Sequence, residues 1–166
     1  MRPTLGIYAS QISGHLQILG AYFAGGVGGP YVSGIDKIAF SGDTQSTLSA
    51  TLSTARDYLA GAANSGTAAY FAGGWDSAPI SNIDKIAFSS DTKSTLSATL
   101  SSARRDFAGA ANSGTAAYFA GGISSSGSNL SGIDKIAFSG DTQSTLSATL
   151  SSARTDLAGA ANSGAI

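Results

Sequence analysis

One sequence unit occurs three times along the chain. Its most regular segment, Ile-Asp-Lys-Ile-Ala-Phe, begins at residues 35, 83 and 133, so the unit recurs after 48 and then 50 residues. Residues 35–74 and 83–122 are identical at 34 of 40 positions. A period near 50 residues indicates one supersecondary unit per repeat, and such units stack because none can bury its apolar side chains alone.

The repeats divide the chain into two parts. Residues 21–166 hold the three repeats, at about 21–68, 69–116 and 117–166. Residues 1–20 do not match the repeat, and we expect them to form a separate attachment segment.

Each repeat is predicted to contain four short strands. Around the third copy these are residues 106–111, 115–120, 133–138 and 145–149, separated by segments rich in Gly, Asn, Ser and Asp. Turn residues at roughly ten-residue spacing predict an all-β fold of antiparallel hairpins. The segment 133–138 does not alternate cleanly between apolar and polar residues, which is expected when both faces of a sheet are covered.

The order of these motifs resembles the kelch repeat of β-propellers over nearly all of residues 21–166. The resemblance implies blades of four antiparallel strands, with three blades per chain. The kelch tryptophan late in the repeat is absent, and Leu48, Leu96 and Leu146 stand nearby, so lighter packing between blades is expected. The positions that match the kelch glycine pair and inner-strand arginine are Gly25, Gly26, Gly73, Gly74, Gly121, Gly122, Arg56, Arg104 and Arg154.

A second motif, Ser41-x-Asp43-x-x-x-Thr47, is similar to the aspartate box of sialidase-type propellers without its Gly and Trp. Its copies place Asp91 and Asp141 at the corresponding turns. The resemblance implies a structural carboxylate that accepts backbone N–H bonds within the hairpin.

Residues 5–16 are similar to the openings of bacteriophage tail and virion structural proteins. This resemblance implies a location in the virion, at the phage tail, and other virion or tail proteins as partners.

The two ends of the repeat array are unequal. The first repeat lacks its first strand, whereas residues 156–162 form a surplus first strand. Three blades are fewer than the roughly 4–8 of known propellers, so we expect the ring to close by oligomerisation with an exchanged strand. A six-bladed homodimer is the favoured assembly, and a trimer, common among phage fibres, is the alternative.

Composition argues against several function classes. The chain has no Cys, no Glu and a single histidine, His15, so we expect no metal site, no cofactor and no enzymatic activity. Charged residues make up 11% and the net charge is −1, which is not the basic footprint of a nucleic-acid-binding protein. No apolar run approaches the ~20 residues of a membrane span, so membrane insertion is not expected.

The loops that follow the paired glycines, residues 27–34, 75–82 and 123–132, differ completely between copies. Loops on a rigid scaffold often carry recognition, and aromatic and short polar side chains suit sugar faces and hydroxyls. Neutral drift in tolerant loops would produce the same variation. The candidate ligand-binding residues are Tyr31, Trp75, Asp76 and Asn129.

Other repeated polar residues are expected to be structural. The three arginines could line an anion channel, but the favoured reading is that they bond carbonyls between neighbouring blades. Asp36 and Lys37, and their copies, are expected to form weak local pairs. The differences that follow each arginine, at 57–59, 105–107 and 155–157, are expected to tune packing at the inner strand.

These observations favour a non-enzymatic phage virion protein that presents propeller loops to a host-surface glycan or to a neighbouring virion protein. The alternative is a cellular kelch-type module for protein–protein interaction. A scaffold with no ligand of its own also stays open.

Overall fold

The computed structural model describes residues 19–163, which form an all-β fold without helices. Each of its strand pairs is antiparallel. The predicted all-β class is thus confirmed. The segment 5–16 and His15 lie outside the described residues. Nothing in residues 19–163 forms a helix long and apolar enough to cross a membrane.

The strands form three larger sheets in the order of the repeats. The first sheet has three strands, and the second and third have four. The first consists of β1 (Gly20–Ala24), β2 (Ile35–Ala39) and β3 (Thr44–Thr47); the second of β4 (Ala60–Asn64), β5 (Ala68–Ala72), β6 (Ile83–Ala87) and β7 (Thr92–Thr95); the third of β9 (Ala108–Asn112), β10 (Ala116–Ala120), β12 (Ile133–Ala137) and β13 (Thr142–Thr145). A two-stranded sheet of β8 (Arg104–Arg105) and β11 (Ile123–Ser124) was not expected.

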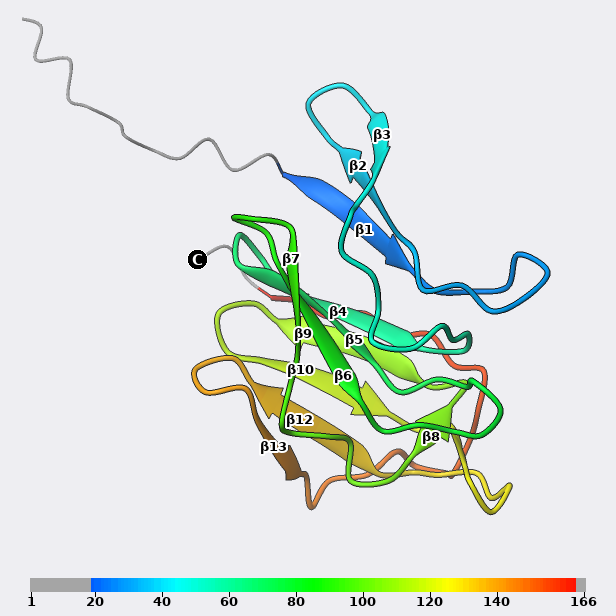
Figure 1. Cartoon of the computed structure of the whole chain (residues 1–166). Coiled ribbons are helices and arrows are strands. Elements are labelled where there is room, and N and C mark those ends of the chain that lie inside the picture. The colour runs from blue at the N-terminus through cyan, green and yellow to red at the C-terminus, as the bar shows by residue number, and fades with distance from the viewer. Residues whose placement is uncertain (1–18, 164–166) are drawn as a thin grey trace, which may run out of the picture.

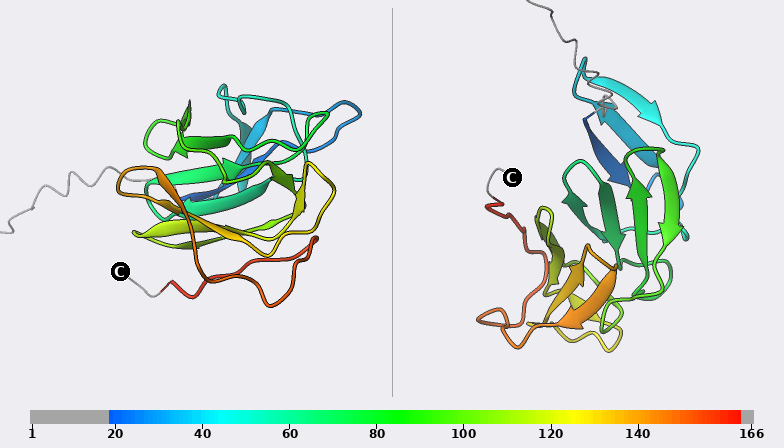
Figure 2. Two further views of the ribbon diagram at one scale, coloured as in Figure 1. Left: turned by 90° about the horizontal axis from the view of Figure 1, so that it is seen from below. Right: turned by 90° about the vertical axis from the view of Figure 1, so that its left-hand side faces the viewer.

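The three sheets follow one another like the leaves of a fan (Figures 1 and 2). In the right-hand view of Figure 2, β4, β9 and the red C-terminal segment lie on one side of the fan, and β3, β7 and β13 on the other. The first and third sheets stand at opposite ends. Within residues 19–163 no sheet closes on itself, and the single chain forms several separate antiparallel sheets.

The fourth strand of each unit lies earlier than predicted. It is β13, Thr142–Thr145, in the third sheet, not residues 145–149. The turn is tighter than expected because Asp141 adopts a left-handed conformation, with φ 51°, and the strand starts directly after it. Asp43 and Asp91 have the same backbone conformation at the equivalent turns. Beyond Thr145 the chain leaves the sheet.

The apolar core lies between successive sheets. One cluster joins the first and second sheets through residues such as Ile35, Leu52 and Phe71. The other joins the second and third sheets through residues such as Tyr70 and Phe119. All five residues of β5 are buried, because the second sheet is covered on both faces. In the third sheet, by contrast, β12 alternates between half-buried and buried residues, so the expectation that both faces are covered at residues 133–138 is not met in the single chain.

The paired glycines hold each sheet to the segment that follows it. Gly26, Gly74 and Gly122 donate their N–H groups to the carbonyls of Arg56, Arg104 and Arg154, at 2.8, 2.9 and 2.9 Å. Gly73 has a φ of +56°, and a Cβ there would lie 2.7 Å from the ring of Phe107. A side chain at this position would therefore be strained and would also clash.

The first strands of the second and third sheets, β4 and β9, and the C-terminal segment are called the inner strands here. They approach one another at glycine residues. A Cβ on Gly109 would lie 2.3 Å from the carbonyl oxygen of Gly61, and a Cβ on Gly159 would lie 2.6 Å from that of Gly109. Each inner strand therefore sits against the preceding one at a distance that only glycine permits. The C-terminal segment follows this rule although it forms no ladder with an outer strand.

Candidate functional site

The three variable loops lie at the same end of the sheets, on the right in Figure 1. The loops follow strands β1, β5 and β10, and one antiparallel bridge joins the two sides of each loop. The bridges join Val27 to Tyr31, Trp75 to Pro79 and Ile123 to Asn129. The sheets therefore present three different loops from equivalent positions.

The predicted ligand-binding residues are distributed over these three loops. Tyr31 is 37% exposed, Asn129 is exposed, and Trp75 and Asp76 are half-buried. Asp76 accepts a hydrogen bond from the hydroxyl of Ser77 at 3.4 Å. The four residues thus share one end of the molecule, but they belong to separate loops and do not line a common pocket.

Trp75 contacts residues outside its own loop. The guanidinium of Arg105 lies 4.9 Å from the centre of the Trp75 ring and 5.7 Å from that of Tyr58. Asp106 holds this guanidinium by an ion pair of 2.7 Å. The Trp75 backbone is fixed by two hydrogen bonds with Asp57, at 3.1 and 2.9 Å. We call Tyr58, Trp75, Arg105 and Asp106 the Trp75 cluster.

The Trp75 cluster adjoins a row of residues that links the inner strands. Tyr58, Asp106 and Asp156 occupy equivalent positions and all have φ between 51° and 56°. Asp106 donates its N–H to the carbonyl of Tyr58 at 3.1 Å, and Asp156 donates to that of Asp106 at 3.0 Å. The same contact therefore passes from each unit to the next.

The carboxyl of Asp106 lies in a crowded electrostatic environment. Burial raises its pKa, the charge of Arg105 opposes this, and the charges of Asp156 and Asp57 raise it further. Two buried atoms next to it, Oδ1 of Asp57 and Nε of Arg105, have no hydrogen-bond partner. The cluster thus combines the half-buried ring of Trp75, the exposed ring of Tyr58 and a cation, whereas these two polar atoms are buried beneath the surface.

Aromatic faces with polar groups at their rims bind the apolar faces and hydroxyls of sugars. Within residues 19–163 no group of three or more His, Cys, Asp or Glu side chains is arranged to hold a metal ion.

The repeated arginines have a structural role at two of their three positions. Arg56 is fully buried, bonds the carbonyl of Phe71 at 3.1 Å and pairs with Asp84 at 3.1 Å. Arg104 pairs with Asp134 at 2.9 Å. Burial lowers the pKa of both arginines, and the facing carboxylates oppose that shift. The anion-channel alternative does not fit these two side chains, whereas Arg154 is exposed.

The aspartates at the hairpin turns link neighbouring sheets. Asp91 accepts the hydroxyl of Tyr22 at 2.7 Å and pairs with Lys37 at 2.8 Å. Asp141 makes the same two contacts, with Tyr70 at 2.8 Å and Lys85 at 2.7 Å. The expectation of local Asp–Lys pairs is wrong, because each of these two lysines reaches an aspartate of the next repeat. The expectation that these carboxylates accept backbone N–H groups within their own hairpins is also wrong, because Asp91 and Asp141 bind side chains of the preceding sheet.

Sequence reasoning missed three members of the Trp75 cluster. Tyr58, Arg105 and Asp106 were expected to tune packing, but they surround the Trp75 ring or hold the cation that does. The signal was present: these positions differ between copies, as the loops do, while the surrounding scaffold stays nearly identical.

A scan against protein-family models and a search among curated proteins found no match to this chain.

Proposed function

We propose that the protein is a non-enzymatic virion component of a bacteriophage, associated with the tail, that binds a host-surface glycan through its variable loops. The virion context is supported by the resemblance of residues 5–16 to openings of phage tail proteins. The binding role is supported by the fold and by the Trp75 cluster.

The observation that carries the binding role is where the repeats differ. The sheets and their contacts are almost unchanged from one copy to the next, whereas the loops at one end are different. The second loop carries the single Trp of the chain, stacked with the cation of Arg105. A flat aromatic face beside hydrogen-bonding groups is the usual platform for a sugar ring.

The test is a glycan array probed with the full chain and with Trp75→Ala. The proposal expects binding that falls at least about tenfold in Trp75→Ala and is largely kept in Trp75→Phe, which retains a ring. Lys93→Ala, on β7 and outside the variable loops, is the control and should leave binding unchanged. Binding that is unchanged in Trp75→Ala, or no binding to any glycan, would contradict the proposal.

The attachment role is tested separately by deleting residues 1–18, which leaves β1 intact. The proposal expects co-purification with tail proteins to be lost and glycan binding to be kept. If both the full chain and the variant without residues 1–18 bind only a cellular protein, the alternative of a kelch-type interaction module is supported.

A further inference from the structure

The first sheet lacks the inner strand that the other two possess. β4 pairs with β5 and β9 pairs with β10, but the corresponding edge of β1 has no partner in residues 19–163. Phe23 of β1 is consequently 60% exposed, whereas its equivalents Phe71 and Phe119 are 6% and 0% exposed. A cavity of about 330 Å³ separates the β1 edge from β4.

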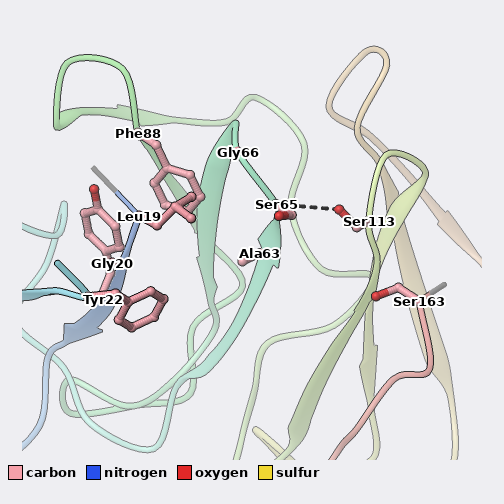
Figure 3. Close-up of a pocket in the computed structure, with 10 residues that line it drawn as sticks. Leu19, Gly20, Tyr22, Ala63, Ser65, Gly66, Phe88, Ser113 and Ser163 are labelled. Carbon is pink, nitrogen blue, oxygen red and sulfur yellow. Dashed lines mark hydrogen bonds between the residues drawn. The ribbon is translucent and has the colours of Figure 1, made fainter. Parts of the chain in front are cut away.

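A second cavity, of about 320 Å³, continues along the same edge (Figure 3). Leu19, Tyr22 and Phe88 lie on one side of it, and the ends of inner strands, marked by Ser65 and Ser113, lie toward the other. Both cavities therefore lie beside β1, in the sheet that lacks an inner strand.

The chain carries that strand at its other end. Residues 158–163 have the same sequence, Ala-Gly-Ala-Ala-Asn-Ser, as residues 60–65 and 108–113. Gly159 lies against Gly109 as Gly109 lies against Gly61. The segment thus follows β4 and β9 as a third inner strand, without the outer strands that would complete a fourth sheet.

The polar contacts between sheets form a series whose third member is not made within the single chain. Oδ2 of Asp84 accepts the N–H and hydroxyl of Ser53 together with Arg56. Asp134 repeats this arrangement with Ser101 and Arg104. The next set in the series is Ser151 and Arg154 with Asp36.

Asp36 and Arg154, which would form the ion pair of this third set, are both exposed. Asp36 accepts bonds from Gln45 and Thr47 on Oδ1, as Asp134 accepts from Gln143 and Thr145. In the described part of the chain, Oδ2 of Asp36 accepts no hydrogen bond. Arg154 is exposed, and its carbonyl accepts the N–H of Gly122, which follows β10 of the third sheet.

The aromatic contacts follow the same rule. Tyr22 stacks on Phe88 at 4.8 Å and Tyr70 stacks on Phe138 at 5.1 Å between ring centres. The next pair in the series is Tyr118 with Phe40, and Phe40 is 60% exposed. Lys135 and Asp43 are likewise the third pair after Lys37–Asp91 and Lys85–Asp141.

We propose that two copies of this chain associate head to tail, so that the C-terminal strand of each completes the first sheet of the other. The pairing of β4 with β5 sets the register: Gly159 of the partner subunit lies opposite Phe23, and Ala161 of the partner subunit lies opposite Ala21. Asp36 forms an ion pair with Arg154 of the partner subunit. Two chains give six sheets, within the usual range of ~4–8 for a closed ring, and three chains would give nine.

The assembly also extends the ligand-binding end. Tyr58 is 54% exposed in the single chain. In the dimer its N–H donates to the carbonyl of Asp156 of the partner subunit, as the N–H of Asp106 donates to the carbonyl of Tyr58. The ring then carries two Trp75 clusters. The association itself rests on the contacts between sheets and not on the proposed ligand, so glycan binding and assembly can fail independently.

Glycine 61 provides the sharpest test. In the single chain a Cβ on Gly61 would make only ordinary contacts of 3.5 and 3.6 Å with Phe71. In the dimer it would meet the carbonyl of Gly159 of the partner subunit, just as a Cβ on Gly109 would meet that of Gly61 at 2.3 Å. Gly61→Ala should therefore fold but not assemble. Gly34→Ala is the matched control, because a Cβ there has open space.

The measurement is the mass in solution of the full chain by light scattering, over a range of concentrations. The proposal expects twice 16.4 kDa for the wild type and for Gly34→Ala, and 16.4 kDa for Gly61→Ala. A wild-type monomer, trimer or open-ended polymer would overturn it. A Gly61→Ala dimer would overturn the proposed interface.

If Gly61→Ala does not fold, Arg154→Ala replaces it, because Arg154 is exposed in the single chain. Removing one partner of a buried ion pair should raise the dissociation constant about a hundredfold or more. Lys93→Ala, which removes a positive charge from the middle sheet, should leave the dimer intact. Equal dissociation constants for Arg154→Ala and the wild type would refute the Asp36–Arg154 contact and with it the proposal.

Discussion

Replacing Asp134 by Ala should destabilise the folded chain by about 3–5 kcal/mol. Asp134 is fully buried, and its two oxygens accept five hydrogen bonds, one of them from the guanidinium of Arg104. The Ala variant leaves Arg104 buried with no opposite charge. Breaking a buried pair in this way costs more than the pair contributes, because the remaining charge keeps its desolvation penalty.

A loss of this size is large against the whole free energy of unfolding, which is about 5–15 kcal/mol for a typical domain. At about 2–4 °C per kcal/mol for a domain of this length, the melting temperature should fall by roughly 6–20 °C. Replacing both partners, in Arg104→Met with Asp134→Leu, should restore most of the loss, since a well-packed apolar pair avoids both desolvation penalties.

The assay is urea unfolding followed by circular dichroism, with every variant made in the Gly61→Ala background so that association does not contribute. Asp36→Ala is the internal control. It removes the equivalent carboxylate at the exposed end of the series, and should cost less than about 1 kcal/mol. A cost below about 1 kcal/mol for Asp134→Ala, or equal costs for the two variants, would refute the buried ion pair.

Three further results are expected. Because the pKa of Asp106 is raised, its charged form opposes folding at neutral pH. Asp106→Asn should therefore have a larger unfolding free energy than the wild type at pH 7. Urea titrations at several pH values should show this difference closing as the pH falls through the raised pKa of Asp106. Arg105→Ala should change the emission of Trp75, the single Trp of the chain, and cost about 1 kcal/mol or less; unchanged fluorescence would contradict the stacking. Tyr70→Phe should cost about 1–2 kcal/mol by removing a bond between sheets, whereas Tyr118→Phe should cost nothing in the Gly61→Ala background, and similar unfolding midpoints for the two would argue against this reasoning.

Much of the fold could be predicted because the repeat carries strong local signals. The Gly-rich turns marked the hairpins. The lack of alternation in residues 133–138 did not predict their burial, because β12 lies in the last sheet of the single chain and alternates between half-buried and buried residues. The fourth strand was misplaced because the left-handed turn at Asp141 is a backbone property that the Ser-Gly-Asp-Thr sequence does not reveal. Polar residues such as Thr142 and Gln143 looked like turn rather than strand, although they form β13.

The contacts between sheets were harder to predict because their partners are a full repeat apart. Lys37 stands next to Asp36 in the sequence but pairs with Asp91, 54 residues away. Only the stacking of one sheet on the next creates such a pair. The Trp75 cluster was missed for the same reason, since Trp75 and Arg105 are brought together by neighbouring units and not by a local motif.

The pattern of change among the repeats bears on whether the free ends are covered. The loop positions 27–34 differ from 75–82 at seven of eight positions, so this chain tolerates change where side chains face solvent. Phe40 and Asp36 are exposed in the single chain, yet they retain the residues that are partly or fully buried in the other copies. An exposed phenylalanine at a hairpin end gains nothing from water, and nothing in an isolated chain requires it. The retained side chains are explained if they meet a surface equivalent to the one that covers Phe88 and Asp84, and the opposite end of a second chain provides such a surface.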